Sequence, residues 1–184
     1  MGAPEDRIHA LDIWRGPLEI SAVAGGLTNR NYLVRDGSRR CIVRLGMDLP
    51  VHRISRANEL AASRAAHAAG LSPAVVHFQP GILVLDYIDA PPLTTEAFSQ
   101  PETLGRVVRL VREVHRQVGQ HLRGPGGLFW VFHIIADYAA SLERAGSAHR
   151  HLLPGLLDSL PGLEQSAGPF ELVFGHNDLL PGNF

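Results

Sequence analysis

The sequence contains no lysine. All 17 of its basic residues are arginine, and with 18 acidic residues they leave a formal net charge of −1. Because the arginines are spread along the chain and form no basic stripe, the composition gives no indication of a nucleic-acid-binding surface. A phosphate-binding lysine is excluded, so a site of that kind would have to use arginine, whose planar guanidinium stays charged and suits phosphate oxygens.

Cysteine and long apolar runs are also scarce. Cys41 stands alone, so no disulfide can form within the chain, which fits a reducing compartment. No apolar run is long enough to cross a bilayer, and the first residues lack the basic-then-apolar order of a secretion signal. We therefore expect a soluble, cytoplasmic protein without a membrane partner, and the sequence leaves its oligomeric state open.

The first half of the sequence is typical of an antiparallel sheet interrupted by one helix. Its β-type runs are separated by turn-forming residues, among them a tight Asp-Gly hairpin signal. Residues 51–70 instead repeat small and apolar side chains at helical spacing and end at Gly70. We expect strands at residues 18–24, 31–36, 41–46, 74–79 and 82–88.

The second half is mainly helical. Paired prolines in residues 89–94 mark a linker, because they continue neither a helix nor a strand. The expected fold class is α+β, with domains 1–89, a small β-rich lobe, and 90–184, a helical lobe. In this second lobe we expect helices at residues 104–118 and 129–145, a weaker helix at 155–163 broken by Pro161, and a strand at 170–174.

A histidine, an aspartate and an asparagine lie just before the last residue, as His176, Asp178 and Asn183. Chance predicts on the order of 0.01 such spacings in a chain of this composition. Phosphoryl transfer to an alcohol needs a carboxylate near the hydroxyl and an oxygen ligand for Mg²⁺, and Asp178 and Asn183 suit these roles. His176 is a catalytic candidate or, more commonly, a residue that braces the loop; a plain polar turn after a strand is the alternative.

A second candidate is the loop between the first two expected strands. Gly25 and Gly26 allow backbone N–H groups to approach a phosphate, and Thr28 and Asn29 add side-chain donors. Taken alone, two glycines between strands more often form an ordinary turn. The loop is not a Walker motif, because that motif needs a lysine and a helix directly after it.

Two further segments belong to the same hypothesis. Arg44 ends the third expected strand and Glu59 lies on the following helix, where a cation that contacts nucleotide phosphates could be held by a glutamate. The alternative is a local pair between Glu59 and Arg56, and the two do not exclude each other. Backbone groups of residues 86–88 (Asp86, Tyr87 and Ile88) could bind an adenine edge, although an ordinary edge strand is equally consistent with the sequence.

Together, the stretches GGLTNRNYLV, IVRLG, the R-x-x-E of residues 56–59, LVLDYI and GHNDLLPGNF resemble the choline/ethanolamine kinase-like branch of the aminoglycoside phosphotransferase superfamily. The resemblance covers essentially the whole chain. It implies a protein-kinase-like fold: an antiparallel β-sheet N-lobe with one helix, and a partial, mainly helical C-lobe that ends in the catalytic loop. It also implies ATP and Mg²⁺ as cofactors and a small-molecule alcohol as acceptor.

The resemblance assigns roles to individual residues. It makes Asp178 the catalytic base and Asn183 a magnesium ligand. It makes Arg44 and Glu59 the pair that clamps the phosphates, and residues 25–29 the loop that covers them.

Members of this family continue past the catalytic loop to a second magnesium-binding aspartate and an acceptor pocket. We therefore expect the 184-residue chain to be a C-terminally truncated fragment with little or no turnover. Choline or ethanolamine is the first expectation for the acceptor, with thiamine, an aminoglycoside or an amino sugar as alternatives. A non-catalytic nucleotide-binding pseudokinase module and an unrelated α+β binding domain remain the competing classes.

Overall fold

A computed structural model describes residues 3–23 and 29–184. The chain forms two compact units, one comprising the residues up to Gly126 together with Val173–Phe184, and the other comprising Gly127–Leu172. The predicted lobes, 1–89 and 90–184, are a different division and stay a prediction. No helix in the described ranges is both long and apolar enough to span a bilayer.

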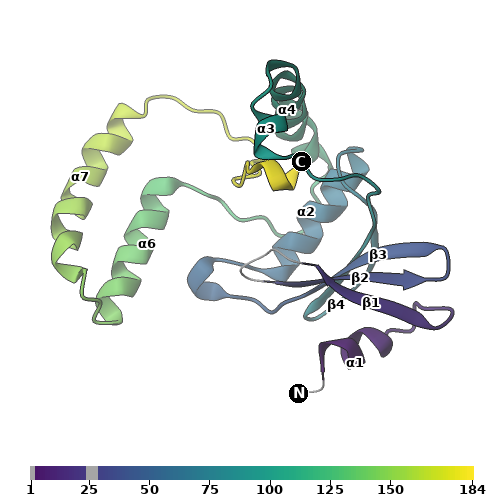
Figure 1. Cartoon of the computed structure of the whole chain (residues 1–184). Helices are drawn as coiled ribbons and strands as arrows, with labels where there is room; N and C mark the ends of the chain where they lie inside the picture. Colours follow the sequence, from purple (N-terminus) through teal and green to yellow (C-terminus); the bar gives the residue numbers. More distant parts are fainter. Residues whose placement is uncertain (1–2, 24–28) are drawn as a thin grey trace. The chain divides into compact units, whose positions relative to one another are not determined.

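The first unit is built on a five-stranded antiparallel sheet in the order β1-β2-β3-β5-β4 (Figure 1). All five predicted strands are confirmed, with small differences at their ends. The Asp-Gly signal forms the β2–β3 hairpin, where Gly37 has a φ of 60° that favours glycine. The strands are β1 (Leu18–Val23), β2 (Arg30–Asp36), β3 (Arg39–Leu45), β4 (Val75–Gln79) and β5 (Ile82–Asp86).

One face of this sheet holds the main apolar core. A short helix that the sequence analysis missed, α1 (Pro4–His9), places Ile8 against this face, and the indole N–H of Trp14 donates to the Ile8 carbonyl at 2.7 Å. The buried core residues are Ile8, Leu11, Tyr32, Val34, Cys41, Val43, Leu45, Ile82 and Val84.

The predicted helix at 51–70 is confirmed in a shorter form, α2 (Arg56–Ala68). Residues Pro50–His52 form a 3₁₀ turn, η1, and Arg53 has a left-handed φ of 56°, so the helix cannot begin at residue 51. Its buried residues Ala61 and Ala65 are small, which allows the helix to lie close to its neighbours.

The first unit also contains α3 (Thr95–Phe98), α4 (Pro101–Glu113), a π-helical turn η2 (Val114–Val118) and α5 (Gly119–His121). These confirm the predicted helix at 104–118. The predicted strand at 170–174 is wrong. Its residues include Phe170 and Leu172, exposed by 64% and 76%, and among the described strands none pairs with this segment, so its backbone lacks the ladder that defines a strand.

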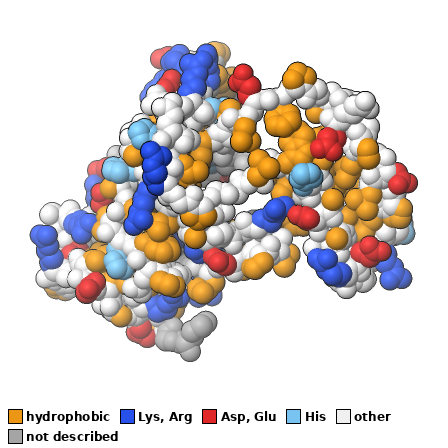
Figure 2. All heavy atoms as spheres, turned by 180° about the vertical axis from the view of Figure 1, so that it is seen from behind, with side chains coloured by type: hydrophobic (Ala, Val, Ile, Leu, Met, Phe, Trp, Pro, Cys, Tyr) orange, Lys and Arg blue, Asp and Glu red, His pale blue; other side chains and the backbone are white. Residues whose placement is uncertain are grey.

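The second unit is a helical pair, α6 (Val131–Arg144) and α7 (Leu153–Ser166), joined through the short η3 (Arg150–Leu152). The predicted break at Pro161 is wrong, because α7 continues through it. The carbonyl of Leu157, which Pro161 leaves without its helical partner, belongs to an exposed residue and can be hydrated. Apolar side chains cover much of the visible surface of this unit (Figure 2), and the exposed ones include Leu142, Leu152, Leu156, Leu157, Leu163 and Phe170.

Candidate functional site

Arg44 lies on the face of the sheet opposite the apolar core. Its strand neighbours Val43 and Leu45 are buried on the core face, and alternation along β3 therefore directs Arg44 the other way, toward α2. There its Nη1 donates to Glu59 Oε1 at 2.5 Å. The two side chains are 32% and 18% exposed, so the pair is only partly hydrated. The structure thus brings together the two residues that the sequence analysis proposed as a clamp.

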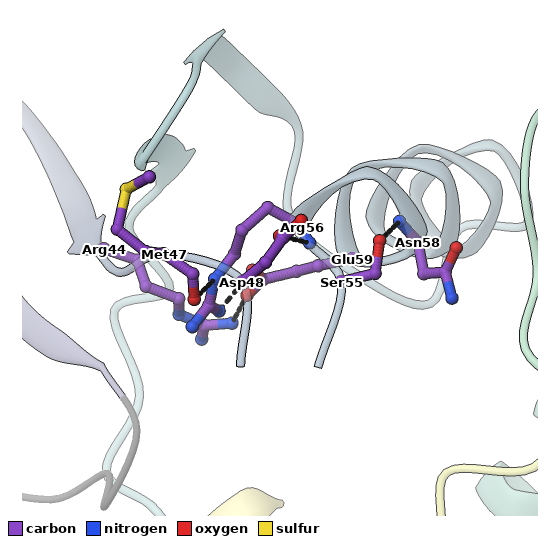
Figure 3. A network of polar contacts seen from close by, with 7 residues as sticks. All are labelled: Arg44, Met47, Asp48, Ser55, Arg56, Asn58 and Glu59. Carbon is purple, nitrogen blue, oxygen red and sulfur yellow. Dashed lines mark hydrogen bonds and ion pairs between the residues drawn. The ribbon is translucent and has the colours of Figure 1, made fainter. Parts of the chain in front are cut away.

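The alternative pairing of Glu59 is present at the same time. Its second oxygen, Oε2, accepts from Arg56 Nη1 at 2.8 Å, so one carboxylate bridges two guanidinium groups (Figure 3). The local pair and the long-range pair therefore coexist. A carboxylate held at both oxygens has little freedom to rotate, and Arg44 is held with it.

The glycine loop can be described only at its end. Gly25, Gly26 and Thr28 lie outside the described residues, so the phosphate-binding prediction for them stays untested. Asn29 is described, and its Oδ1 is buried without a hydrogen-bond partner among the described residues. Arg44 Nε is likewise buried and has no hydrogen-bond partner among the described residues.

The predicted adenine-binding segment is attached firmly to the sheet. The N–H of Asp86 donates to the Ala74 carbonyl at 3.0 Å, and the N–H of Tyr87 donates to the Arg40 carbonyl at 3.2 Å. These two donors are therefore already engaged. Ile88 is 59% exposed, and within the described residues its N–H has no hydrogen bond. A ligand at this segment would therefore use Ile88 N–H or the backbone carbonyls.

Arg40 fixes the same segment through its side chain, which the sequence analysis did not single out. Its guanidinium lies 4.6 Å from the centre of the Tyr87 ring and donates to both oxygens of Asp89 at 3.1 and 2.7 Å. These hydrogen bonds hold the pKa of Asp89 below its usual range. No sequence signal points to this contact, because 49 residues separate Arg40 from Asp89.

The C-terminal segment folds into a closed loop. The amide Nδ2 of Asn183 donates to the backbone carbonyl of Asp178 at 2.9 Å and to its Oδ2 at 3.0 Å. The turn η4 (Pro181–Asn183) and a left-handed φ of 61° at Asn177 bring the two residues together. Both side chains are exposed.

Phe184 attaches this loop to the rest of the first unit. Its carbonyl accepts from Leu93 N–H at 2.8 Å, and its ring lies 5.8 Å from that of Phe98 and 6.3 Å from that of His176. His176 therefore packs beside an aromatic anchor. Its contact supports the loop-bracing interpretation; the catalytic assignment of His176 stays a prediction.

The donor set of the loop suits magnesium as part of a larger complex. Since Asn183 directs its Nδ2 to Asp178, its Oδ1 has no hydrogen bond among the described residues and is the type of oxygen ligand that Mg²⁺ prefers. The described residues contain no group of three or more His, Cys, Asp or Glu side chains able to hold a metal by themselves. Mg²⁺ usually binds proteins through one or two side chains and takes its other ligands from substrate phosphates and water.

Comparisons with solved structures place the fold. A choline/ethanolamine kinase family protein from Mesorhizobium loti matches with 31% identity and a TM-score of 0.68, over 97% of this chain and 58% of its own. An ethanolamine kinase from Plasmodium vivax matches with 19% identity and a TM-score of 0.73, over 90% and 51%. A choline kinase from Streptococcus pneumoniae matches with 22% identity and a TM-score of 0.70, over 98% and 62%.

The sheet, its helix α2 and these likenesses define an α+β, protein-kinase-like fold, as predicted from the sequence. Residues 19–184 match the model of the phosphotransferase enzyme family, and the chain belongs to that family. A comparison with curated proteins gave no match. The chain spans between 51% and 62% of the length of the three solved proteins described above.

Proposed function

We propose that this chain carries the nucleotide-binding and catalytic-loop part of an ATP-dependent kinase that phosphorylates the hydroxyl of a small molecule, with choline or ethanolamine as the acceptor. The observation that carries the proposal is the ion pair between Arg44 of β3 and Glu59 of α2. It places a partly exposed guanidinium near the end of a sheet strand, and among the described residues only its Nη1 makes a hydrogen bond, which leaves Nη2 available. A guanidinium with an unused donor suits a phosphate oxygen.

The catalytic loop supplies the second half of the reaction. Asp178 is the candidate base that accepts the proton of the acceptor hydroxyl as the phosphoryl group is transferred. The contact from Asn183 Nδ2 to Asp178 Oδ2 fixes the carboxylate and leaves its Oδ1 for the hydroxyl. Catalysis of this type depends mainly on positioning and on stabilising the charge of the phosphates.

Magnesium would be held by Asn183 Oδ1 together with phosphate oxygens of the nucleotide. When bound, the ion neutralises charge on the phosphates. Residues 25–29 are proposed to cover the phosphates, and the backbone of residues 86–88 to contact the adenine.

The similar structures support the choice of acceptor: the Mesorhizobium loti protein belongs to the choline/ethanolamine kinase family, and the other two are an ethanolamine kinase and a choline kinase. A cytoplasmic location is part of the proposal. It is supported by the single Cys41, which is buried and makes no disulfide.

The experiment is an acceptor screen on the protein expressed from its full reading frame, monitored by ADP formation. Choline or ethanolamine should stimulate ADP release in the presence of Mg²⁺. D178N should lower kcat by about 10²-fold or more, the usual contribution of a general base. D158N, which changes an exposed aspartate of α7, is the matched control and should retain full activity. ADP release that no acceptor stimulates would contradict the proposal.

A further inference from the structure

Arg56 is a charged side chain that is buried in the described part of the chain, with 8% of its surface exposed. A buried guanidinium is strongly destabilising unless its donors are satisfied. Here Nη1 donates to Glu59 Oε2 at 2.8 Å and Nε donates to the Met47 carbonyl at 3.0 Å. Its backbone N–H, at the first residue of α2, donates to Asp48 Oδ1 at 2.7 Å. Arg56 thus joins α2 to the turn that follows β3 (Figure 3).

The space around this guanidinium depends on Gly46. A Cβ at that position would lie 2.6 Å from Arg56 Nη2 and 2.5 Å from Asn29 Oδ1, both far inside van der Waals contact. Glycine therefore leaves the volume that the Arg56 guanidinium and the Asn29 amide oxygen occupy. Asn29 is the last residue of the proposed phosphate-covering loop, residues 25–29, so the end of this loop lies beside the same network.

The consequence for Arg44 follows from how Glu59 is shared. Arg56 binds Oε2, and Arg44 contacts Oε1 alone, through a single nitrogen. Without Arg56, the carboxylate could turn and bind Arg44 through both oxygens, in the fork geometry that guanidinium and carboxylate groups favour. Arg44 would then be drawn toward the glutamate and would have fewer donors for a phosphate.

The geometry points to Arg56 as a positioning residue that fixes Glu59, and through it directs Arg44 toward the phosphates of a nucleotide. This inference rests on the proposed function, because it assigns Arg56 to the same nucleotide site. Arg56 itself need not touch the nucleotide. Its effect should therefore depend on the phosphates of the ligand and on the presence of Arg44.

The test compares binding of ATP with Mg²⁺ and binding of adenosine to the 184-residue chain by calorimetry. R56M should weaken ATP binding about tenfold, equivalent to about 1.4 kcal/mol, and leave adenosine binding unchanged. R56K keeps the charge but lacks the planar fork, and should weaken ATP binding about threefold. R64M changes an exposed arginine of the same helix and should bind both ligands like the unmodified chain.

A double variant separates positioning from general stability. If Arg56 acts through Arg44, R44M/R56M should bind ATP no more weakly than R44M alone, because the guanidinium that Arg56 positions is already absent from R44M. Circular dichroism establishes that each variant is folded. If R56M does not fold, R56K and R44M/R56K provide the same comparisons.

Four outcomes would overturn part of the argument. Failure of the unmodified chain to bind ATP would count against the proposed function itself. ATP binding by the Arg56 variants equal to that of R64M would overturn only the positioning role. Equal losses for ATP and adenosine, or additive losses in the double variant, would also overturn it, because they indicate a purely structural effect.

Discussion

Glu59→Gln is the perturbation that tests the polar network most directly. It removes a negative charge that lies between two guanidinium groups at 2.5 and 2.8 Å while preserving the shape of the side chain. Removing one partner of a buried ion pair destabilises a protein by about 3–5 kcal/mol. Here the amide oxygen of glutamine can still accept one bond, and Arg56 keeps its bond to the Met47 carbonyl, so we expect a loss of about 2–3 kcal/mol.

The assay is urea unfolding followed by tryptophan fluorescence. The chain has two tryptophans, Trp14 in the first unit and Trp130 in the second, so a W130F background makes Trp14 the reporter of the unit that contains Glu59. R64Q, an exposed change on the same helix, is the control and should stay within about 0.5 kcal/mol. If the unfolding free energy of E59Q differs from that of the unmodified chain by less than about 0.5 kcal/mol, the reasoning is refuted, because the network would then be as weak as a surface pair.

Three other predictions concern separate parts of the chain. R40M should return the pKa of Asp89 to its ordinary range, measured by carboxyl NMR titration. Because this pKa is lowered in the folded unmodified chain, the stabilisation from ionised Asp89 is present above about pH 3.9 and is lost as the pH falls through the folded pKa. Burial raises the pKa of the Cys41 thiol, so a thiol reagent should react only after unfolding, and rapid labelling of the folded chain would contradict this. Because this pKa is raised in the folded state, the stabilisation from the neutral thiol should be lost as the pH rises above about 8.5. G162A should stabilise the chain by up to about 1 kcal/mol, measured by thermal unfolding, because a Cβ there meets nothing within 4 Å and α7 loses a flexible residue; a lower midpoint would count against it.

The sheet was predictable from the sequence because its signals are local. Alternating residues and the turn at Gly37 define β2 and β3 without knowledge of the rest of the chain. The helix α1 gave no such signal, because it has six residues and its apolar contact comes from Ile8 alone. The segment 170–174 gave a false signal, since its composition suits a strand but no described strand pairs with it.

The candidate site was predictable only in part. The pair of Arg44 and Glu59 could be expected from the resemblance, and its geometry is observed, although its role remains a proposal. The sequence offered Arg56 only as a competitor for Glu59, because spacing along a helix cannot show that a carboxylate has two partners. The anchor made by Phe184 and the contact of Arg40 with Asp89 depend on residues far apart in the chain.

The two candidate clusters share one property, which connects the fold to the proposed chemistry. Glu59 is held by guanidinium groups at both oxygens, and Asp178 is held by the amide of Asn183. Among the described residues, Arg44 Nη2 and Asn183 Oδ1 have no hydrogen bond. In each cluster, internal contacts fix the side chains and leave at least one of these polar atoms unused. Those unused atoms are a donor suited to phosphate and an acceptor suited to magnesium, so the site would meet a nucleotide with its groups already oriented.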